Sequence, residues 1–253
     1  MIPKKIHYCW LGENPLPESA KKCIKSWKKH CPDYEIIEWN EMNYDFTKNR
    51  YMREAFEAKK WGFVPDYARL DIIYQHGGIY LDTDVELVRP YEDLLQYEGF
   101  AGFESAQYVA LGLGFGAEAG NSIIKKLLDS YESLTFLNPD GSLNMIASPK
   151  LNTDVLVCEG LVLDGSMQVI NGFGFLPPEY LCPKSFDDGI IRKTKNTYSI
   201  HHFDASWLDD KTQAKKIERW KRKQKKQARA KIRHFAVKLI GEKNYKWIRG
   251  AKQ

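Results

Sequence analysis

Two neighbouring stretches of the sequence, Asp66-Tyr67-Ala68-Arg69-Leu70 and Gly77-Gly78-Ile79-Tyr80-Leu81-Asp82-Thr83-Asp84, decide the fold. Just before the first stretch, Pro65 suits the first turn of a helix, and Asp66 adds a negative charge that is favourable there. Gly77 is the type of residue that ends a helix. The sequence therefore predicts a helix from Pro65 to the residue before Gly77.

The second stretch places two acids at the end of a strand. Ile79–Leu81 predicts a short strand that runs into Asp82 and Asp84. In open α/β sheets, ligands bind beyond the carboxyl ends of the strands. A kink at this point would let both carboxylates approach one hard cation, because Mg²⁺ and Mn²⁺ prefer oxygen ligands and often share them with phosphates. A turn with two solvated acids is the alternative.

Outward from this centre, strands and helices alternate along the chain. Strands are predicted at Lys4–Trp10, Tyr34–Trp39, Phe100–Phe103 and Leu111–Gly116, and helices at Glu18–His30, Arg50–Trp61 and Asn121–Leu134. This order favours an α/β fold whose sheet has mostly parallel strands. The pattern of residues 136–200 is irregular and predicts no further element.

Three motifs in order resemble glycosyltransferase family 32, whose members include bacterial capsular polysaccharide sugar transferases and the fungal initiating mannosyltransferase. They are Ile2–Gly12, the central pair of stretches, and His201-His202-Phe203-Asp204-Ala205-Ser206-Trp207. The resemblance covers residues 1–210. It implies a GT-A fold, in which a Rossmann-like mixed sheet flanked by helices forms one catalytic domain that binds a nucleotide sugar.

The resemblance also implies a metal site for Mn²⁺ or Mg²⁺. Asp84 would be the direct ligand, and Asp82 would contact the metal or the ribose. A C-terminal histidine would complete the shell, and His202 fits that pattern better than His201. Either histidine could instead be satisfied by the backbone, and the doubled histidine leaves the register open.

Further residues would bind the nucleotide and the sugar. By the same resemblance Asp66 holds sugar hydroxyls, Arg69 contacts sugar or phosphate, and Ser206 and Trp207 lie over the nucleotide. The remaining candidates are aromatic residues that could equally be core: Tyr8, Trp10 and Tyr80.

The family resemblance implies transfer with retention at the anomeric carbon. Asn152 and Asp154 lie in a plausible sugar-pocket segment, and Asp154 is the best available carboxylate. We nevertheless expect transfer from the leaving-group face, with the departing diphosphate taking the acceptor's proton.

The donor and the acceptor are expected from the family resemblance. We expect a hexose donor, with a weak preference for UDP-galactose or another UDP-hexose, and a growing lipid-linked bacterial surface glycan (capsule, exopolysaccharide or O-antigen) as acceptor. A metal-dependent phosphoryl hydrolase and a non-catalytic scaffold at the membrane are the alternative functions.

The charge of the chain is divided between two parts. Residues 211–253 hold 17 Lys and Arg against two acids, a net +15, whereas the rest of the chain holds 21 basic and 31 acidic groups, a net −10. In this tail, less polar residues recur every three or four positions. This pattern predicts a basic amphipathic helix on an anionic membrane surface, although a helix packed on the domain stays possible. The body is acidic, so we expect no nucleic-acid partner.

The expected location is the cytoplasm, at the inner face of the cell membrane. The sequence has no apolar run of 18 residues, and its start does not resemble a secretory signal. Five cysteines without a CxxC pair favour reduced thiols.

Overall fold

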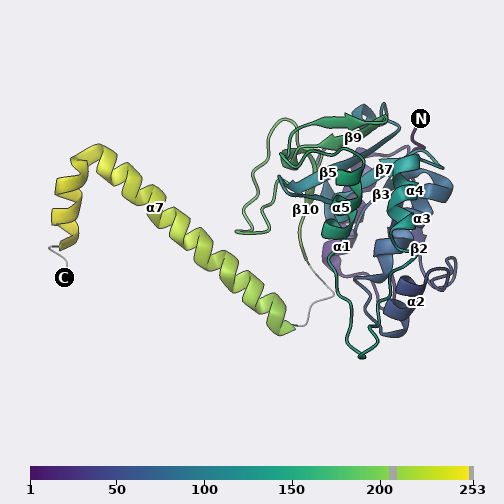
Figure 1. Cartoon of the computed structure of the whole chain (residues 1–253). Helices are drawn as coiled ribbons and strands as arrows, with labels where there is room; N and C mark the ends of the chain where they lie inside the picture. The colour runs from purple at the N-terminus through teal and green to yellow at the C-terminus, as the bar shows by residue number, and fades with distance from the viewer. Residues whose placement is uncertain (205–209, 251–253) are drawn as a thin grey trace. The chain divides into compact units, whose positions relative to one another are not determined.

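A computed structural model describes residues 1–204 and 210–250 of the chain, and its core is a sheet with helices packed on it (Figure 1). The sheet has eight strands in the order β2-β1-β3-β7-β5-β9-β8, with β6 paired to β5. The predicted α/β fold is confirmed. The strands are β1 (Lys5–Cys9), β2 (Glu35–Trp39), β3 (Gly78–Tyr80), β5 (Gly99–Ser105), β6 (Tyr108–Ala110), β7 (Phe115–Ala117), β8 (Gln168–Ile170) and β9 (Phe173–Leu176).

The mixed sheet that the resemblance implies is confirmed, whereas the strand order along the sequence had favoured mostly parallel strands, and four of the seven strand pairs described in this sheet are antiparallel. β1 is parallel to β2 and β3, and β5 is parallel to β9, but β7 is antiparallel to both of its neighbours, β3 and β5. β6 forms a tight hairpin with β5, in which Ser105 lies opposite Tyr108, and β7 continues in the direction of β6 after the short 3₁₀ turn η2 (Leu111–Leu113), so both strands are antiparallel to β5. As a result β1, β3, β5 and β9 point the same way, and β7 begins at the edge where they end.

Helices occupy both faces of the sheet. They are α1 (Glu18–His30), α2 (Arg50–Glu57), α3 (Val64–His76), α4 (Ser122–Asp129), α5 (Ser148–Cys158) and the single turn α6 (Pro178–Leu181). Along β1 the side chains alternate: Cys9 joins the main core with residues of α2, α3 and α4, whereas the Tyr8 ring packs against Trp27 of α1 at 5.6 Å. Helices therefore cover β1 on both sides.

The connection from α3 to β3 requires its two glycines. Gly77 ends α3 with φ 61°, and a Cβ on it would lie 2.9 Å from the Ala119 nitrogen. Gly78 has φ 103°, and a Cβ there would lie 2.9 Å from the carbonyl oxygen of Lys5. Both positions combine a left-handed backbone with contact to neighbouring chain, so only glycine fits without strain. This turn fixes where β3 begins and therefore where Asp82 and Asp84 lie.

Several sequence-based assignments differ from the structure. The helix predicted for Asn121–Leu134 ends at Asp129, and the predicted strand Leu111–Gly116 is the 3₁₀ turn η2 followed by β7. The helix predicted to reach Trp61 ends at Glu57, and Lys59 beyond it has φ 54°. Residues 136–200, for which no element was predicted, contain α5, β8, β9, α6 and the first two residues of β10 (Ser199–His201). Proline obscured α5 in the sequence, but Pro149 lies in its first turn, where a missing N–H has no consequence.

A second, two-stranded sheet carries the closing part of the chain back to the centre. β10 pairs antiparallel with β4 (Val85–Leu87), and His201 lies opposite Val85. The indole nitrogen of Trp27 donates a 2.7 Å hydrogen bond to the Val85 carbonyl, which fixes β4 on α1. The second sheet therefore begins one residue after Asp84.

The rest of the chain forms a separate compact unit, made of α7 (Asp210–Gly250) and the loop Ser185–Ile190. We call this loop together with the stretch 219–227 of α7 the clasp. In the clasp, the Trp220 indole donates a 2.9 Å hydrogen bond to the Phe186 carbonyl, and the Gln224 amide donates one of 2.8 Å to the Asp188 carbonyl. A Cβ on Gly189 would lie 2.5 Å from the Trp220 ring, so the loop backbone packs directly on the indole.

Beyond the clasp, most of the described side chains of α7 are exposed. Gly241 has φ 79° and ψ 153°, so it interrupts the helical backbone. Within the described part of the chain, no helix combines the length and the apolar character that crossing a membrane requires.

Candidate active site

The candidate site lies at the sheet edge where β1, β3, β5 and β9 end. Asp82 and Asp84 follow β3 directly, and Trp10 follows β1. Because β7 runs in the opposite direction, η2, which precedes it, lies at this edge as well. The strand order thus places the ends of β1 and β3 and the turn η2 at one edge of the sheet.

Asp84 is held from both sides by the closing part of the chain. The Nε2 atom of His201 lies 3.1 Å from Oδ1 of Asp84, and the Asp204 backbone N–H donates a 2.8 Å hydrogen bond to Oδ2. Burial by itself favours the neutral acid, but the charge and hydrogen bond of His201 outweigh it and lower the pKa of Asp84 to about 2. Asp84 is therefore an anion over the physiological pH range.

The assignment of His202 as a metal ligand is wrong in this geometry. His201, which the sequence left as the other possibility, faces Asp84, whereas His202 Nε2 lies 2.8 Å from Glu86 Oε2. Neighbouring residues of an extended strand point to opposite sides, so only one of the two histidines can face the aspartates. Pairing of His201 with Val85 on β4 selects that residue.

Asp82 belongs to a buried ion-pair chain with two residues of α3. Arg69 Nη2 lies 2.8 Å from Asp66 Oδ1 and 3.6 Å from Asp82 Oδ1. Asp66 is 6% exposed and Arg69 is 5% exposed. Burial raises the pKa of Asp66 to about 6 and also raises that of Asp82, while Arg69 opposes both shifts. The two acids thus share one buried guanidinium.

Among the described residues, Asp82, Asp84 and His201 offer ligand atoms within 4.8 Å of one another. Two carboxylate oxygens and one imidazole nitrogen form a donor set that suits Mn²⁺ or Mg²⁺. The residues present therefore fit a divalent cation.

Gly112 of η2 forms one wall of the site. A Cβ on this residue would lie 2.5 Å from Asp82 Oδ2 and 3.2 Å from Arg69 Nη1. Its φ is not in the left-handed region, so the close approach of η2 to the carboxylate is what requires glycine here. Sequence reasoning missed this residue, because only the fold brings η2 to Asp82.

The aromatic candidates lie in different surroundings. Tyr80 is 1% exposed, with Arg69 over its ring at 5.4 Å, so it supports the guanidinium from within the core. Tyr8 is 7% exposed and donates a 2.6 Å hydrogen bond to Glu38. Trp10 is partly exposed, and its indole donates a 2.5 Å hydrogen bond to the Asn14 carbonyl. Of the three, Trp10 has the ring most open to a nucleotide base.

Asn152 and Asp154, which were predicted from the sequence to lie in one sugar-pocket segment, have different surroundings in the structure: Asn152 is buried and Asp154 is exposed. The Ser148 side chain hydrogen-bonds to Asp66, and Asn152 follows one helical turn later on the same face of α5. Asn152 is 2% exposed, and its Oδ1 has no hydrogen-bond partner among the described residues. Asp154 points outward: its side chain is 61% exposed and lies 2.6 Å from Lys150. The choice of Asp154 as the best carboxylate in the sugar pocket is therefore wrong.

Two of the predicted nucleotide-binding residues, Ser206 and Trp207, lie outside the described residues. Conversely, the structure adds Glu104 at the end of β5, which interacts electrostatically with His201. No spacing rule connects Glu104 to Asp84, so the sequence offered no signal for it.

Comparison with known proteins gives a family match that includes Asp66–Asp84. Residues 17–101 match the family described as "Glycosyltransferase sugar-binding region containing DXD motif". The mannosyl phosphorylinositol ceramide synthase SUR1 of Saccharomyces cerevisiae is 34% identical over 104 residues, which is 40% of this chain and 27% of SUR1. The "Subversion of eukaryotic traffic protein A" of Legionella pneumophila is 27% identical over 52% of this chain and 25% of its own length.

The matched stretches thus span about a quarter of the length of these relatives. Among solved structures, the PaToxG glycosyltransferase has a TM-score of 0.48 and 22% identity, over 62% of this chain and 70% of that protein.

Proposed function

Because this chain carries the glycosyltransferase sugar-binding region with its DXD motif, we propose that it is a metal-dependent glycosyltransferase that uses a nucleotide diphospho-sugar. The observation that carries the proposal is the group Asp82, Asp84 and His201, beside the buried Asp66–Arg69 pair. A cation site next to hydrogen-bonding groups suits a donor with an anionic diphosphate and a neutral sugar.

Each residue then has a role that its geometry supports. Asp84 and His201 would hold the divalent ion, and Asp82 would bind the ion as well or contact the ribose. When bound, the ion would stabilise the negative charge that develops on the departing diphosphate. Asp66 accepts hydrogen bonds from sugar hydroxyls, and Arg69 orients Asp66 and Asp82.

We propose retention by transfer from the leaving-group face. The acceptor oxygen forms a bond to the anomeric carbon as the bond from that carbon to the phosphate oxygen breaks. The electron pair of that bond stays on the phosphate oxygen, which also takes the acceptor's proton. The exposure of Asp154 and its pairing with Lys150 support a path without that carboxylate as nucleophile.

The donor sugar that we propose is a hexose. UDP-galactose and other UDP-hexoses are the first candidates. GDP-mannose joins them because several similar proteins, among them inositol phosphoceramide mannosyltransferase 3 of Schizosaccharomyces pombe, are named as mannosyltransferases. A lipid-linked bacterial surface glycan is the proposed acceptor.

The test is hydrolysis of these nucleotide sugars with Mn²⁺ or Mg²⁺, before and after EDTA. The wild type should release hexose from one donor, and Asp84→Asn should lower that rate at least about 100-fold, because a ligand is lost. Asp129→Asn is the matched control, since its carboxylate is an exposed surface ion pair with Lys125. Full activity in EDTA or in Asp84→Asn would refute the proposal, and phosphate release from simple phosphoesters would favour a hydrolase.

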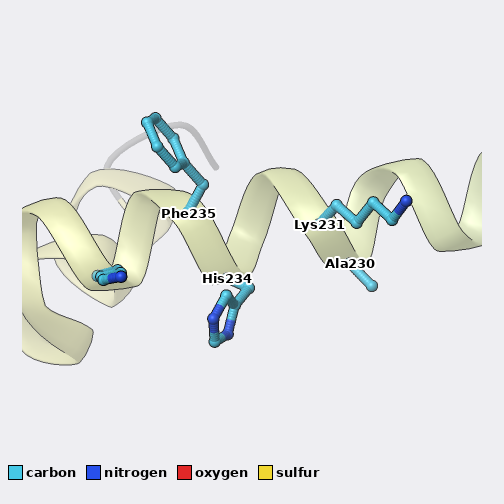
Figure 2. Close-up of a pocket in the computed structure, with 5 residues that line it drawn as sticks. Ala230, Lys231, His234 and Phe235 are labelled. Carbon is cyan, nitrogen blue, oxygen red and sulfur yellow. The ribbon is translucent and has the colours of Figure 1, made fainter.

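We further propose that α7 binds an anionic membrane surface from the cytoplasmic side. Ile232, Phe235 and Leu239 are 63–69% exposed and lie three and four residues apart, and most of their neighbours are basic. Figure 2 shows this part of α7, with Phe235 on one side of the helix and Ala230 and His234 on the other. Each Lys or Arg near such a surface contributes about 1 kcal/mol.

Vesicle flotation tests the membrane proposal. The full chain should float with vesicles that contain phosphatidylserine and not with pure phosphatidylcholine. Phe235→Glu combined with Leu239→Glu should abolish flotation, whereas Phe235→Leu, which keeps the apolar side chain, should not. Equal flotation of the double variant would exclude this face as the attachment surface.

A further inference from the structure

An irregularity in β5 directs attention to Glu104. β5 and β6 pair in register up to Phe103 opposite Val109, and the next pair is Ser105 opposite Tyr108. Glu104 is therefore one extra residue without a partner on β6. Such bulges change the direction of a side chain and are over-represented beside active sites.

The bulge lies at the edge that carries the candidate site. β5 runs parallel to β1 and β3, so Glu104, at its carboxyl end, shares that edge with Asp82 and Asp84. Both β5 and β10 contact η2, whose Gly112 lies against Asp82. Glu104 also interacts electrostatically with His201. Three independent features therefore place this carboxyl group next to the cation-binding residues.

Glu104 is not one of those residues. It does not belong to the Asp82, Asp84 and His201 group, whose ligand atoms lie within 4.8 Å of one another. Among the residues whose side chains the structure describes, it makes no hydrogen bond or ion pair, although it is partly buried. Burial raises its pKa against the opposing effect of His201. Buried polar groups are normally hydrogen-bonded, so this partly buried carboxyl group has oxygen atoms available to accept hydrogen bonds from a bound ligand.

The charge of the group limits what that partner can be. A carboxylate repels the oxygens of a diphosphate, so the phosphate part of the donor is excluded. A sugar offers neutral hydroxyl groups, and hydrogen bonds from hydroxyls to a carboxylate gain strength where water is partly excluded. The group therefore suits the sugar end of the donor.

We propose that Glu104 is a sugar-binding residue of the donor site and accepts hydrogen bonds from hydroxyl groups of the transferred hexose. The proposal rests on the proposed function, and it gives the site a carboxylate on a strand different from that of the DXD motif. Asp66 and Glu104 would then contact the hexose from α3 and from β5.

The test compares affinity for a nucleotide sugar with affinity for the nucleotide alone. Titration calorimetry with Mn²⁺ would use UDP-galactose, UDP-glucose and GDP-mannose, each against UDP or GDP. Glu104→Ala should weaken the sugar nucleotide about 10- to 100-fold and leave the nucleotide diphosphate within twofold, because one hydrogen bond to a charged group is lost. Glu104→Gln keeps an acceptor oxygen and the side-chain shape, so it should fall between the two.

Glu98→Ala is the matched control, because Glu98 is exposed and immediately precedes β5, at the opposite sheet edge. Equal loss of sugar-nucleotide and nucleotide binding in Glu104→Gln would overturn the inference, as would wild-type affinity for both ligands in Glu104→Ala. If the wild type bound no nucleotide sugar at all, the proposed function itself would fail.

Discussion

Gly112 shows how much a single missing side chain can matter in this site. The residue brings η2 against Asp82 and Arg69, with space for a hydrogen atom but not for a methyl group. A methyl group would displace Asp82, because the other near atom belongs to the buried guanidinium of Arg69. The position of Asp82, one of the candidate metal ligands, therefore depends on a residue that has no functional group of its own.

We predict that Gly112→Ala weakens Mn²⁺ binding about 10- to 100-fold, the range seen when groups that orient metal ligands are altered. The free energy of unfolding should change by less than about 1 kcal/mol, since alanine restricts the unfolded chain and the native backbone is not left-handed here. Calorimetric Mn²⁺ titration and thermal unfolding measure the two effects. Unchanged Mn²⁺ affinity would contradict the role given to Gly112.

At the scale of single residues, the sequence predicted the central motif well. The structure brings Asp66, Arg69, Asp82 and Asp84 together, because they lie on one helix–turn–strand segment whose local signals are strong. His201 could not be selected over His202 from sequence, since the choice depends on the pairing of β10 with β4, more than a hundred residues away. Local patterns carry no information about such a register.

At the scale of elements, helices and strands marked by local sequence signals were predicted correctly, and those that depend on long-range contacts were not. The helix before Gly77 and the strands β1 and β2 were predictable because glycine, proline and alternation mark them locally. α5 was missed because prolines interrupt the stretch and its apolar pattern is weak: the buried side chains include the polar Asn152 and also Thr153, which accepts a 2.9 Å hydrogen bond from the Val109 backbone N–H. Tertiary contacts, not periodicity, determine this helix.

The clasp is the element-scale feature whose stability can be measured directly. We predict that Trp220→Ala accelerates amide hydrogen exchange in Ser185–Ile190 by at least about tenfold, because the loop backbone rests on the indole. Phe235→Ala, which removes an exposed ring from the same helix, is the control and should leave exchange unchanged. Equal exchange rates in wild type and Trp220→Ala would show that the indole does not hold the loop.

At the scale of the whole molecule, His7 makes the free energy of unfolding depend on pH. It is fully buried, its Nδ1 accepts a 3.0 Å hydrogen bond from the Trp39 indole, and its Nε2 donates one of 3.0 Å to Gly77. Because the indole can only donate, Nε2 carries the proton of a neutral ring. Burial is the main reason that the pKa of His7 is lowered to about 4.

We predict that His7 makes the protein less stable as pH falls from about 6.5 to 4. In this window the unfolded state binds a proton that the folded state does not, so the contribution of His7 decreases by up to about 3 kcal/mol. The raised pKa of Asp66 acts in the opposite direction. Urea unfolding of wild type and His7→Gln across this range isolates the His7 contribution, and parallel pH profiles would refute it.

Because of the clasp, residues 211–253 cannot be separated cleanly from the rest of the chain. The chain passes between its two compact units three times, because the loop Ser185–Ile190 belongs with α7 and the residues on either side of it do not. A cut after residue 210 would leave the Phe186 carbonyl and the buried Asp188 without their partners from α7. Conversely, a graft of residues 211–253 onto another protein would transfer the basic residues of α7 without the loop Ser185–Ile190 on which the helix packs. The tail is therefore a part of the molecule that can be altered by point substitution more cleanly than it can be exchanged.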